Sequence, residues 1–403
     1  MSKSGERRMI VRARLVVTMD GPPIENGAVA ISGDRIVDVG KLPEITARNR
    51  GETIDLGEQA LLPGLINAHC HLDYTCLRGK IGRQKSFTDW IRAINAEKAG
   101  LTPADYVSSI NQGFTEAKHF GTTSIANLTA FSELISRFNA PVRTWWFPEL
   151  IDVRTPELLD VALESLRGVT HGGLAPHAPF TASADLYQRC ERMTASKNIL
   201  LTTHLAESRE EMSMFRDASG PLYDFLKSMG RNMNDCGAET PLGHFLKILS
   251  AETKRDWTVA HLNELTKNDL DLLRGLNQWL SIVHCPRSHD YFGHSPFQFQ
   301  DLRDLGFNIC LGTDSLASND DLSLFAEMRV FQKRFKNADP LHIFEMVTVR
   351  PAFALGQPAR LGRIRQDCLA DLIAVPCSNT TEVFESIIAW EGPVTWSMIG
   401  GVA

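Results

Sequence analysis

Apolar and polar positions follow one pattern near the two ends of the chain and another in the middle. Near the ends, short runs are apolar or alternate apolar with polar residues, and Gly, Pro and Asp interrupt them, which is typical of β-strands. These runs are VRARLVVTMD, GAVAISGD and RIVDVG at one end, and ADLIAVPC, ESIIAW and VTWSMIG at the other. We therefore predict that residues 1–58 and 363–403 together form one composite, β-sandwich-like domain.

Residues 59–362 instead alternate apolar runs with segments of helical periodicity. The runs predicted as strands are LLPGLINAH, TTSIANL, VRTWWFPEL, GLAPHAP, ILLTTHLAE, WTVAHL, LSIVHCP and NICLGTDS. Strands that alternate with helices in this number predict an α/β fold with a closed, parallel (β/α)8 TIM-like barrel. The alternative is an open doubly wound sheet, which typically carries a Gly-rich phosphate loop after an early strand, and the sequence has none. Residues 208–256 are too long for one loop and helix, so we predict an insertion there over the barrel mouth.

Several of the predicted helices have recognisable first turns. Thr102 and Asp105 have the spacing of a capping box, with Pro at the first helical position. The same pattern predicts helix starts at 266–269 and 318–321. Gly121 is predicted to end the helix that starts after Thr102.

Composition and charge restrict the partners and the compartment. The 403 residues carry 42 Lys and Arg against 48 Asp and Glu, with no long basic run, so we expect no nucleic-acid partner. No apolar run approaches the ~18 residues of a membrane span, and the first residues lack the apolar stretch of a signal peptide. The 8 cysteines include no CxxC pair, which favours free thiols in a reducing compartment. We therefore expect a cytoplasmic protein that acts on a small molecule.

Candidate chemistry lies where the predicted strands end, because active sites of such barrels form at the carboxyl ends of the strands. One such histidine is usually a satisfied core or capping residue. Here nearly every run ends in a polar group, and burying so many imidazoles without a shared ion would cost several desolvation penalties. In strand order these residues are His69, His71, His177, His204, Glu207, His261, His284 and Asp314.

The spacing of the first two histidines points to a metal ion. His69 and His71 are two positions apart, so on a strand both side chains lie on one face and can reach one cation. With a histidine from the fifth strand and a carboxylate from the eighth, the donor set suits Zn²⁺, with Fe²⁺ as the alternative.

These residues stand in motifs that resemble the amidohydrolase superfamily. The resemblance extends from the N-terminal β-segment to Asp371, and the closest branch is that of cytosine deaminase and the chlorohydrolases. Within that branch, the phrases around 204, 284 and 314 are most similar to aminodeoxyfutalosine deaminase-like proteins. The motifs, in the family's order, are PGLINAHCH (63–71), HLAES (204–208), AH (260–261), HCPRSH (284–289) and GTDS (312–315).

The resemblance implies one divalent metal ion, bound by His69, His71, His204 and Asp314. Binuclear members carry a carboxylated lysine at the end of the fourth strand, where this chain has His177.

The resemblance also implies the catalytic roles. Asp314 would take a proton from the attacking water, and His261 would orient that water and stabilise the developing charge. Glu207 would protonate the ring nitrogen beside the attacked carbon and then pass protons to the leaving amine. The alternative for Glu207 is a surface carboxylate at the start of the next helix.

The residues expected on the substrate side have more ordinary alternatives. His177 is either a substrate contact or a turn residue, and Trp90 either stacks on a planar base or packs its loop. Glu149 either accepts from a ribose hydroxyl or belongs to an ion pair at the rim, and Arg287 is often merely solvated in such a place. The full set of predicted substrate contacts is His177, Glu149, Trp90, Arg78, His284, Arg287, His289 and Ser315.

The resemblance thus implies a mononuclear hydrolytic deaminase of an amino-purine nucleoside or base, with 6-aminodeoxyfutalosine of the menaquinone pathway as the favoured substrate. S-adenosylhomocysteine deaminases carry a second arginine near the end of the third strand, where this chain offers Glu149, so that substrate is discounted. The alternatives are a chlorohydrolase or amide hydrolase and a deaminase of guanine or another adenosine derivative. A non-catalytic scaffold is disfavoured because every expected ligand is present. We expect a homodimer.

Overall fold

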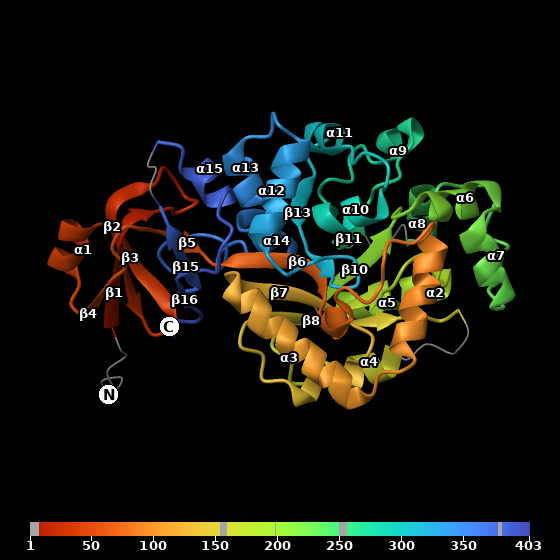
Figure 1. Cartoon of the computed structure of the whole chain (residues 1–403), viewed down its shortest axis with the longest axis horizontal. Helices are drawn as coiled ribbons and strands as arrows, with labels where there is room; N and C mark the ends of the chain where they lie inside the picture. The colour runs from red at the N-terminus through yellow and green to blue at the C-terminus, as the bar shows by residue number, and fades with distance from the viewer. Residues whose placement is uncertain (1–7, 154–158, 198, 250–255, 378–380) are drawn as a thin grey trace.

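Two β-sheets organise the chain, and one of them is wound into a barrel (Figure 1). The computed structural model describes residues 8–153, 159–197, 199–249, 256–377 and 381–403. Within these ranges, no helix is both long and apolar enough to cross a membrane.

The larger sheet contains nine strand segments, and every neighbouring pair in it is parallel. Each predicted strand of the middle region forms, and nearly all of these residues are buried because helices cover the outer face. The segments are β6 (Leu65–His71), β7 (Thr122–Thr129), β8 (Arg143–Leu150), β9 (Gly173–Pro176), β10 (Leu200–Leu205), β11 (Trp257–His261), β12 (Leu280–His284), β13 (Asn308–Leu311) and β14 (Asp314–Ser315).

The sheet closes because β13 and β14 are two halves of one strand. β13 pairs with β12, and β14 pairs with β6, the first strand of the barrel. Between the halves, the backbone N–H of Gly312 donates to the carbonyl of His284 at 3.0 Å, and that of Thr313 donates to the carbonyl of His69 at 3.1 Å. The eighth strand is therefore bonded to both neighbours, and the predicted parallel α/β barrel is confirmed.

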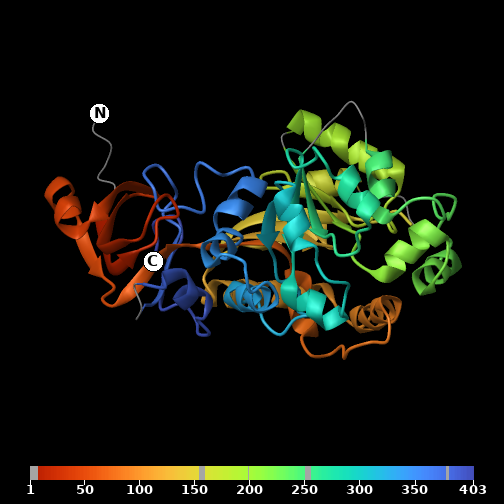
Figure 2. The ribbon, with the colours of Figure 1, turned by 90° about the horizontal axis from the view of Figure 1, so that it is seen from above.

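Helices follow the strands and surround the barrel (Figure 2). Residues 208–256 are predicted to be an insertion. Their described part, which ends at residue 249 and resumes at 256, contains the helices α6 (Arg209–Asp217), α7 (Pro221–Ser228) and α8 (Pro241–Ile248) at the edge of the molecule away from the second sheet. The main helices around the barrel are α2 (Phe87–Lys98), α3 (Pro103–His119), α4 (Leu159–Ser165), α5 (Ala184–Lys197), α9 (Lys267–Leu272), α10 (Pro286–Phe292), α11 (Phe299–Asp304), α12 (Leu324–Arg334), α13 (Pro340–Glu345) and α14 (Val349–Ala354).

One face of α3 is apolar and packs against the barrel. Ile110, Phe114 and Ala117 are fully buried, and they pack in one cluster with Ile125 of β7 and Trp146 of β8. Burial of a large apolar side chain of this kind stabilises the fold by about 1.5–3 kcal/mol. The apolar residues that recur at helical spacing therefore form the face of α3 that packs against the barrel.

The helix caps agree with the sequence at two of the three predicted places. Capping boxes form at Thr102 and Thr266, and Gly121 follows the end of α3 with a φ of 83°. The start predicted at 318–321 is wrong, because α12 begins at Leu324 with Ser323 as its cap. The amide of Asn319 is instead engaged by the carbonyl of Thr313 at 2.8 Å and by the carboxylate of Glu327 at 2.7 Å, so this segment forms a turn next to the barrel mouth.

The smaller sheet draws strands from both ends of the chain, and its red N-terminal and dark blue C-terminal strands lie side by side in both ribbon views. Its strand order is β16-β15-β5-β1-β2-β3, and β4 pairs with β1. The predicted sandwich character and the boundaries 1–58, 59–362 and 363–403 stay a prediction. The strands are β1 (Arg8–Val16), β2 (Ile24–Ser32), β3 (Arg35–Lys41), β4 (Glu52–Asp55), β5 (Gln59–Pro63), β15 (Leu372–Pro376) and β16 (Trp396–Met398), with the helices α1 (Leu42–Arg48) and α15 (Val383–Ile388) nearby.

The run LLPGLINAH, predicted as one strand, is shared between the two sheets. β5 pairs with β1 and β15, and β6 begins the barrel two residues later. Gly64 lies at the change, where an added Cβ would come within 2.1 Å of the Thr123 hydroxyl oxygen. The strand is divided here because only a residue without a side chain permits the backbone to pass this close to β7.

Replacing Gly64 with Ala should therefore destabilise the protein by about 1–3 kcal/mol through overpacking. Urea-induced unfolding followed by circular dichroism measures the change. Gly82→Ala is the matched control, since nothing lies within 4 Å of an added Cβ there. Equal stability of the two variants would contradict this account of the strand break.

Candidate active site

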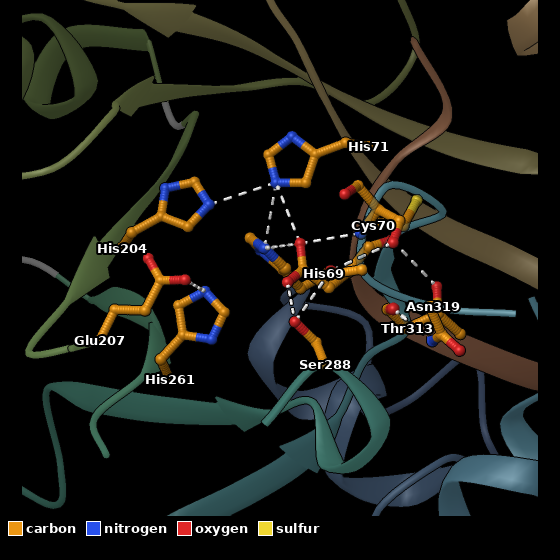
Figure 3. A network of polar contacts seen from close by, with 12 residues as sticks. His69, Cys70, His71, His204, Glu207, His261, Ser288, Thr313 and Asn319 are labelled. Atoms are coloured by element: carbon orange, nitrogen blue, oxygen red, sulfur yellow. Dashed lines mark hydrogen bonds and ion pairs between the residues drawn. The ribbon is translucent and has the colours of Figure 1, made fainter. Parts of the chain in front are cut away.

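Three histidines converge at the carboxyl end of the barrel (Figure 3). Nε2 of His71 lies 3.3 Å from Nε2 of His69 and 3.2 Å from Nε2 of His204. The two histidines of β6 share one face of the strand, as their spacing predicts, and His204 comes from β10 across the barrel. All three rings are at least nine-tenths buried.

The hydrogen bonding of His204 leaves a nitrogen lone pair that faces the other two rings. Burial, together with the neighbouring His204 and His71, holds the pKa of His69 well below its usual range, and burial lowers the pKa of His204 as well. Nδ1 of His204 lies 2.8 Å from the carbonyl oxygen of His177, which can only accept, so this nitrogen carries the proton and Nε2 keeps its lone pair. Neutral imidazoles whose Nε2 atoms converge in this way are suited to bind one cation.

A carboxylate completes the set. Oδ1 of Asp314 lies 3.9 Å from Nε2 of His69 and 3.7 Å from Nε2 of His71. The other oxygen accepts a hydrogen bond from the Ser288 hydroxyl at 2.6 Å, which orients the group. Three imidazole nitrogens and one carboxylate oxygen match the donors that Zn²⁺ takes, so this arrangement fits one divalent metal ion.

Glu207 lies directly beyond the end of β10, next to the three histidines. Its carboxyl oxygen is 3.7 Å from Nε2 of His261, and both side chains are at least nine-tenths buried. Burial and the nearby carboxylates of Asp314 and Glu211 raise the pKa of Glu207 well above its usual range. The group therefore favours its protonated form, in which it can donate a proton.

The backbone that carries Glu207 is held by two residues that sequence reasoning did not identify. The carboxylate of Glu211 accepts the backbone N–H of Glu207 at 2.7 Å and that of Ala206 at 3.2 Å. The amide of Asn263 donates to the carbonyl of Glu207 at 3.1 Å. Glu211 stands in the first turn of α6, where an acidic residue is ordinary, so only the fold distinguishes this one.

The strand ends at this site adopt unusual backbone conformations. Ala206, His261 and Asp314 have φ values of 49°, 76° and 57° in the left-handed region, which non-glycine residues rarely adopt. Each such residue costs on the order of 1 kcal/mol and persists where surrounding contacts hold it. Backbone hydrogen bonds of 2.9 Å from Asn263 and Glu264 to the carbonyl of Ala206 do so here.

A cavity of about 430 Å³ opens above the histidines. Its floor contains His71, His204 and His261, and its outer wall is apolar and includes side chains of α2 and of the insertion helix α7. The predicted contacts His177, Glu149, Trp90 and Ser315 also line it. Glu149 approaches two of the rings, at 3.8 Å from Nδ1 of His71 and 4.0 Å from Nε2 of His177. The insertion helix α7 thus contributes to the mouth of the cavity.

Four predicted substrate contacts lie outside this cavity, and their roles stay a prediction. Arg78 pairs with Glu116 at the surface. The guanidinium of Arg287 is engaged by Asp321 at 2.6 Å and by Asp320 at 3.0 Å. The ring of His284 stacks on Phe297 with centroids 4.0 Å apart, and Nδ1 of His289 lies 3.1 Å from the side-chain oxygen of Asn263.

Two further cavity residues went unnoticed in the sequence. Lys98, the last residue of α2, and Tyr74, in the 3-10 helix η1 (Leu72–Leu77), both line the cavity. A lysine in the last turn of a helix usually complements the helix dipole, and a tyrosine after a strand usually packs, so neither residue type signals a site.

Replacing His71 with Ala should abolish binding of a divalent metal ion. Nε2 of His71 lies next to the Nε2 atoms of both His69 and His204, so its loss removes the central ligand of the three. The zinc content of the purified protein, measured by mass spectrometry, should fall from about one ion per chain to near zero. The exposed His119 offers a matched control, and His119→Ala should keep its metal. Full zinc content in His71→Ala would exclude this set of ligands.

Comparison with known proteins agrees with this geometry. A sequence model described as the Amidohydrolase family matches residues 60–389. The 5-methylthioadenosine/S-adenosylhomocysteine deaminase of Nitratidesulfovibrio vulgaris is 28% identical over 390 residues, which cover 91% of this chain and 83% of that protein. An adenosine deaminase from Xanthomonas campestris with bound zinc superposes with a TM-score of 0.83 at 24% identity, covering 99% of this chain and 93% of the other. The aminofutalosine deaminase of Helicobacter pylori in complex with methylthio-coformycin has a TM-score of 0.85 at 19% identity, covering 98% and 99%. The chain belongs to the amidohydrolase family.

Proposed function

We propose that the protein is a metal-dependent hydrolytic deaminase of amino-purine nucleosides. The observation that carries the proposal is the carboxyl group of Glu207, buried beside His261 and next to the three converging histidines. A site that only binds a metal needs no second, protonated acid at its edge. Attack on an aromatic ring does need one, because the electrons displaced from the attacked carbon move onto the ring nitrogen.

The metal ion would be held by His69, His71, His204 and Asp314, and we propose zinc. When bound, such an ion supplies an activated water for attack on the carbon that bears the amino group.

The chain's own residues would move the protons. The carboxylate of Asp314, held by Ser288, takes a proton from the attacking water. The carboxyl of Glu207 donates its proton to the adjacent ring nitrogen, and the imidazole of His261 stabilises the charge that develops between them. The ionised Glu207 then takes the proton of the new hydroxyl group and passes it to the amino group, so that the C–N bond breaks, ammonia leaves and a carbonyl forms. The proton held by Asp314 finally restores Glu207 to its acid form.

The shape of the cavity supports a substrate larger than a free base. The polar floor is suited to a purine ring, while the cavity continues past Glu149 and His177 to an apolar outer wall formed by residues such as Ile94, Phe180 and Leu226. We propose that Glu149 accepts a hydrogen bond from a ribose hydroxyl. We propose 6-aminodeoxyfutalosine as the substrate, and the relatives named as 5-methylthioadenosine/S-adenosylhomocysteine deaminases make those nucleosides the compounds to compare.

The direct test is a screen of 6-aminopurine nucleosides for released ammonia with the zinc-loaded protein. It includes 6-aminodeoxyfutalosine, 5′-methylthioadenosine, S-adenosylhomocysteine and adenosine, and a chloro-substituted purine nucleoside tests for release of chloride. Ammonia from at least one amino compound supports the proposal. Release of chloride alone would replace it with a chlorohydrolase activity.

Replacing Glu207 with Gln keeps the shape of the side chain and removes its acidic proton. Zinc content should stay unchanged, and turnover should fall by roughly 10²- to 10⁴-fold, as expected for loss of a general acid. The surface residue Glu239 provides a control, since Glu239→Gln should leave kcat unchanged. Joint loss of zinc and activity in Glu207→Gln would make Glu207 a metal ligand instead of the acid.

A further inference from the structure

Lys98 is a cation in the wall of the cavity that the proposed mechanism does not use. Its Nζ donates a hydrogen bond of 2.9 Å to the Tyr74 hydroxyl and lies 4.7 Å from the centre of the same ring. Within the described part of the chain, the ammonium group forms this hydrogen bond and no ion pair. An ammonium group has three N–H donors, so two of them remain for a partner in the cavity.

The surroundings place Lys98 between the metal site and the mouth. The Tyr74 ring stacks on His71 with ring centroids 6.0 Å apart, so the ammonium group lies one aromatic ring away from the floor. Lys98 and His177 line the same cavity. Lys98 therefore lies in the cavity wall, beyond the histidines of the floor.

The wall around this cation restricts what the partner can be. Ile91 and Ile94 of the same helix, with Phe225 and Met229 of the insertion, supply apolar surface to the cavity that Lys98 also lines. A phosphate group is usually held by several donors, such as arginines or a helix N-terminus, whereas a single carboxylate needs only one or two. One ammonium group beside apolar surface therefore suits a carboxylate on a hydrophobic arm.

We infer that Lys98 selects substrates whose 5′ substituent ends in a carboxylate, and that it does so by pairing its ammonium group with that carboxylate. The inference rests on the proposed deamination, because it concerns the part of the nucleoside that extends away from the metal. It makes Lys98 a specificity-determining residue with no part in the chemical step.

A rival account is purely structural. Burial raises the pKa of Glu149 to about 8, and the positive charge of Lys98 opposes that rise. If compensating this buried carboxyl were its whole role, removal of the charge would affect every substrate alike. The two accounts therefore differ in whether the effect depends on the substrate.

The test compares two 6-aminopurine nucleosides that differ only at the end of the 5′ substituent, which carries a carboxylate in one and the neutral carboxamide in the other. For the wild-type protein, kcat/KM should be roughly 10- to 100-fold higher for the carboxylate, as expected for one charge-assisted hydrogen bond. Lys98→Met should remove this preference by raising KM for the carboxylate, while kcat/KM for the carboxamide stays within about twofold.

Three controls make the comparison decisive. Lys98→Arg keeps the charge and should keep most of the preference. Lys80→Met, an identical substitution at an exposed position outside the cavity, should change neither substrate. Zinc content and the midpoint of thermal unfolding, measured for each variant, identify any variant that is misfolded, and Lys98→Arg then still tests the charge.

The outcomes separate this inference from the proposed function. If no 6-aminopurine nucleoside releases ammonia with the wild-type protein, the deaminase proposal fails. If ammonia is released but the wild type has no preference for the carboxylate, or Lys98→Met keeps the preference, only the role of Lys98 is overturned. An equal loss on both substrates with zinc retained would establish the structural account.

Discussion

The interaction on which the site depends is the convergence of three neutral imidazoles inside a closed barrel. Their Nε2 atoms are 3.2–3.3 Å apart along His204, His71 and His69, a spacing at which all three nitrogens can bind one shared cation. Such convergence requires that β6 and β10, on different sides of the barrel, end at the same level along the barrel axis. Closure of the sheet fixes that level, because the eighth strand is hydrogen-bonded to β12 and to β6 at the same time.

Closure also explains why the strand ends are strained. The eighth strand changes partner at Gly312 and Thr313, and Asp314 follows at once with a left-handed φ of 57°. An added Cβ at Gly312 would lie 2.7 Å from the carbonyl oxygen of His69, so the close approach of these two segments needs a glycine. The strained backbone at Asp314 brings its carboxylate to the histidines. The hydrogen bond from the Ser288 hydroxyl helps to hold the carboxylate in this position.

Much of this was predictable from the sequence where the signal is a spacing. The two-residue separation of His69 and His71 fixes their shared face whatever the tertiary structure, and the apolar runs fix the order of strands on whose ends the polar groups lie. Other expectations depended on rotation about side-chain bonds and on helix placement. Arg287 follows a strand end as a substrate contact would, yet two aspartates of the next loop engage it. Lys98 occupies an ordinary helical position, and only the packing of α2 over the mouth brings it into the cavity.

The two buried carboxyl groups of the site show how one small volume can hold both an acid and a base. Asp314 and Glu207 are equally buried, at 7% exposure each, and their like charges disfavour joint ionisation. Burial raises the pKa of Asp314 as well, but hydrogen bonds from the Ser288 hydroxyl and from the backbone N–H of Ser315 at 2.8 Å stabilise its charged form and oppose that rise. Around Glu207, burial and the neighbouring carboxylates all favour the neutral form. Unequal hydrogen bonding therefore separates the two groups, so that one is suited to accept a proton from water and the other to donate a proton to a ring.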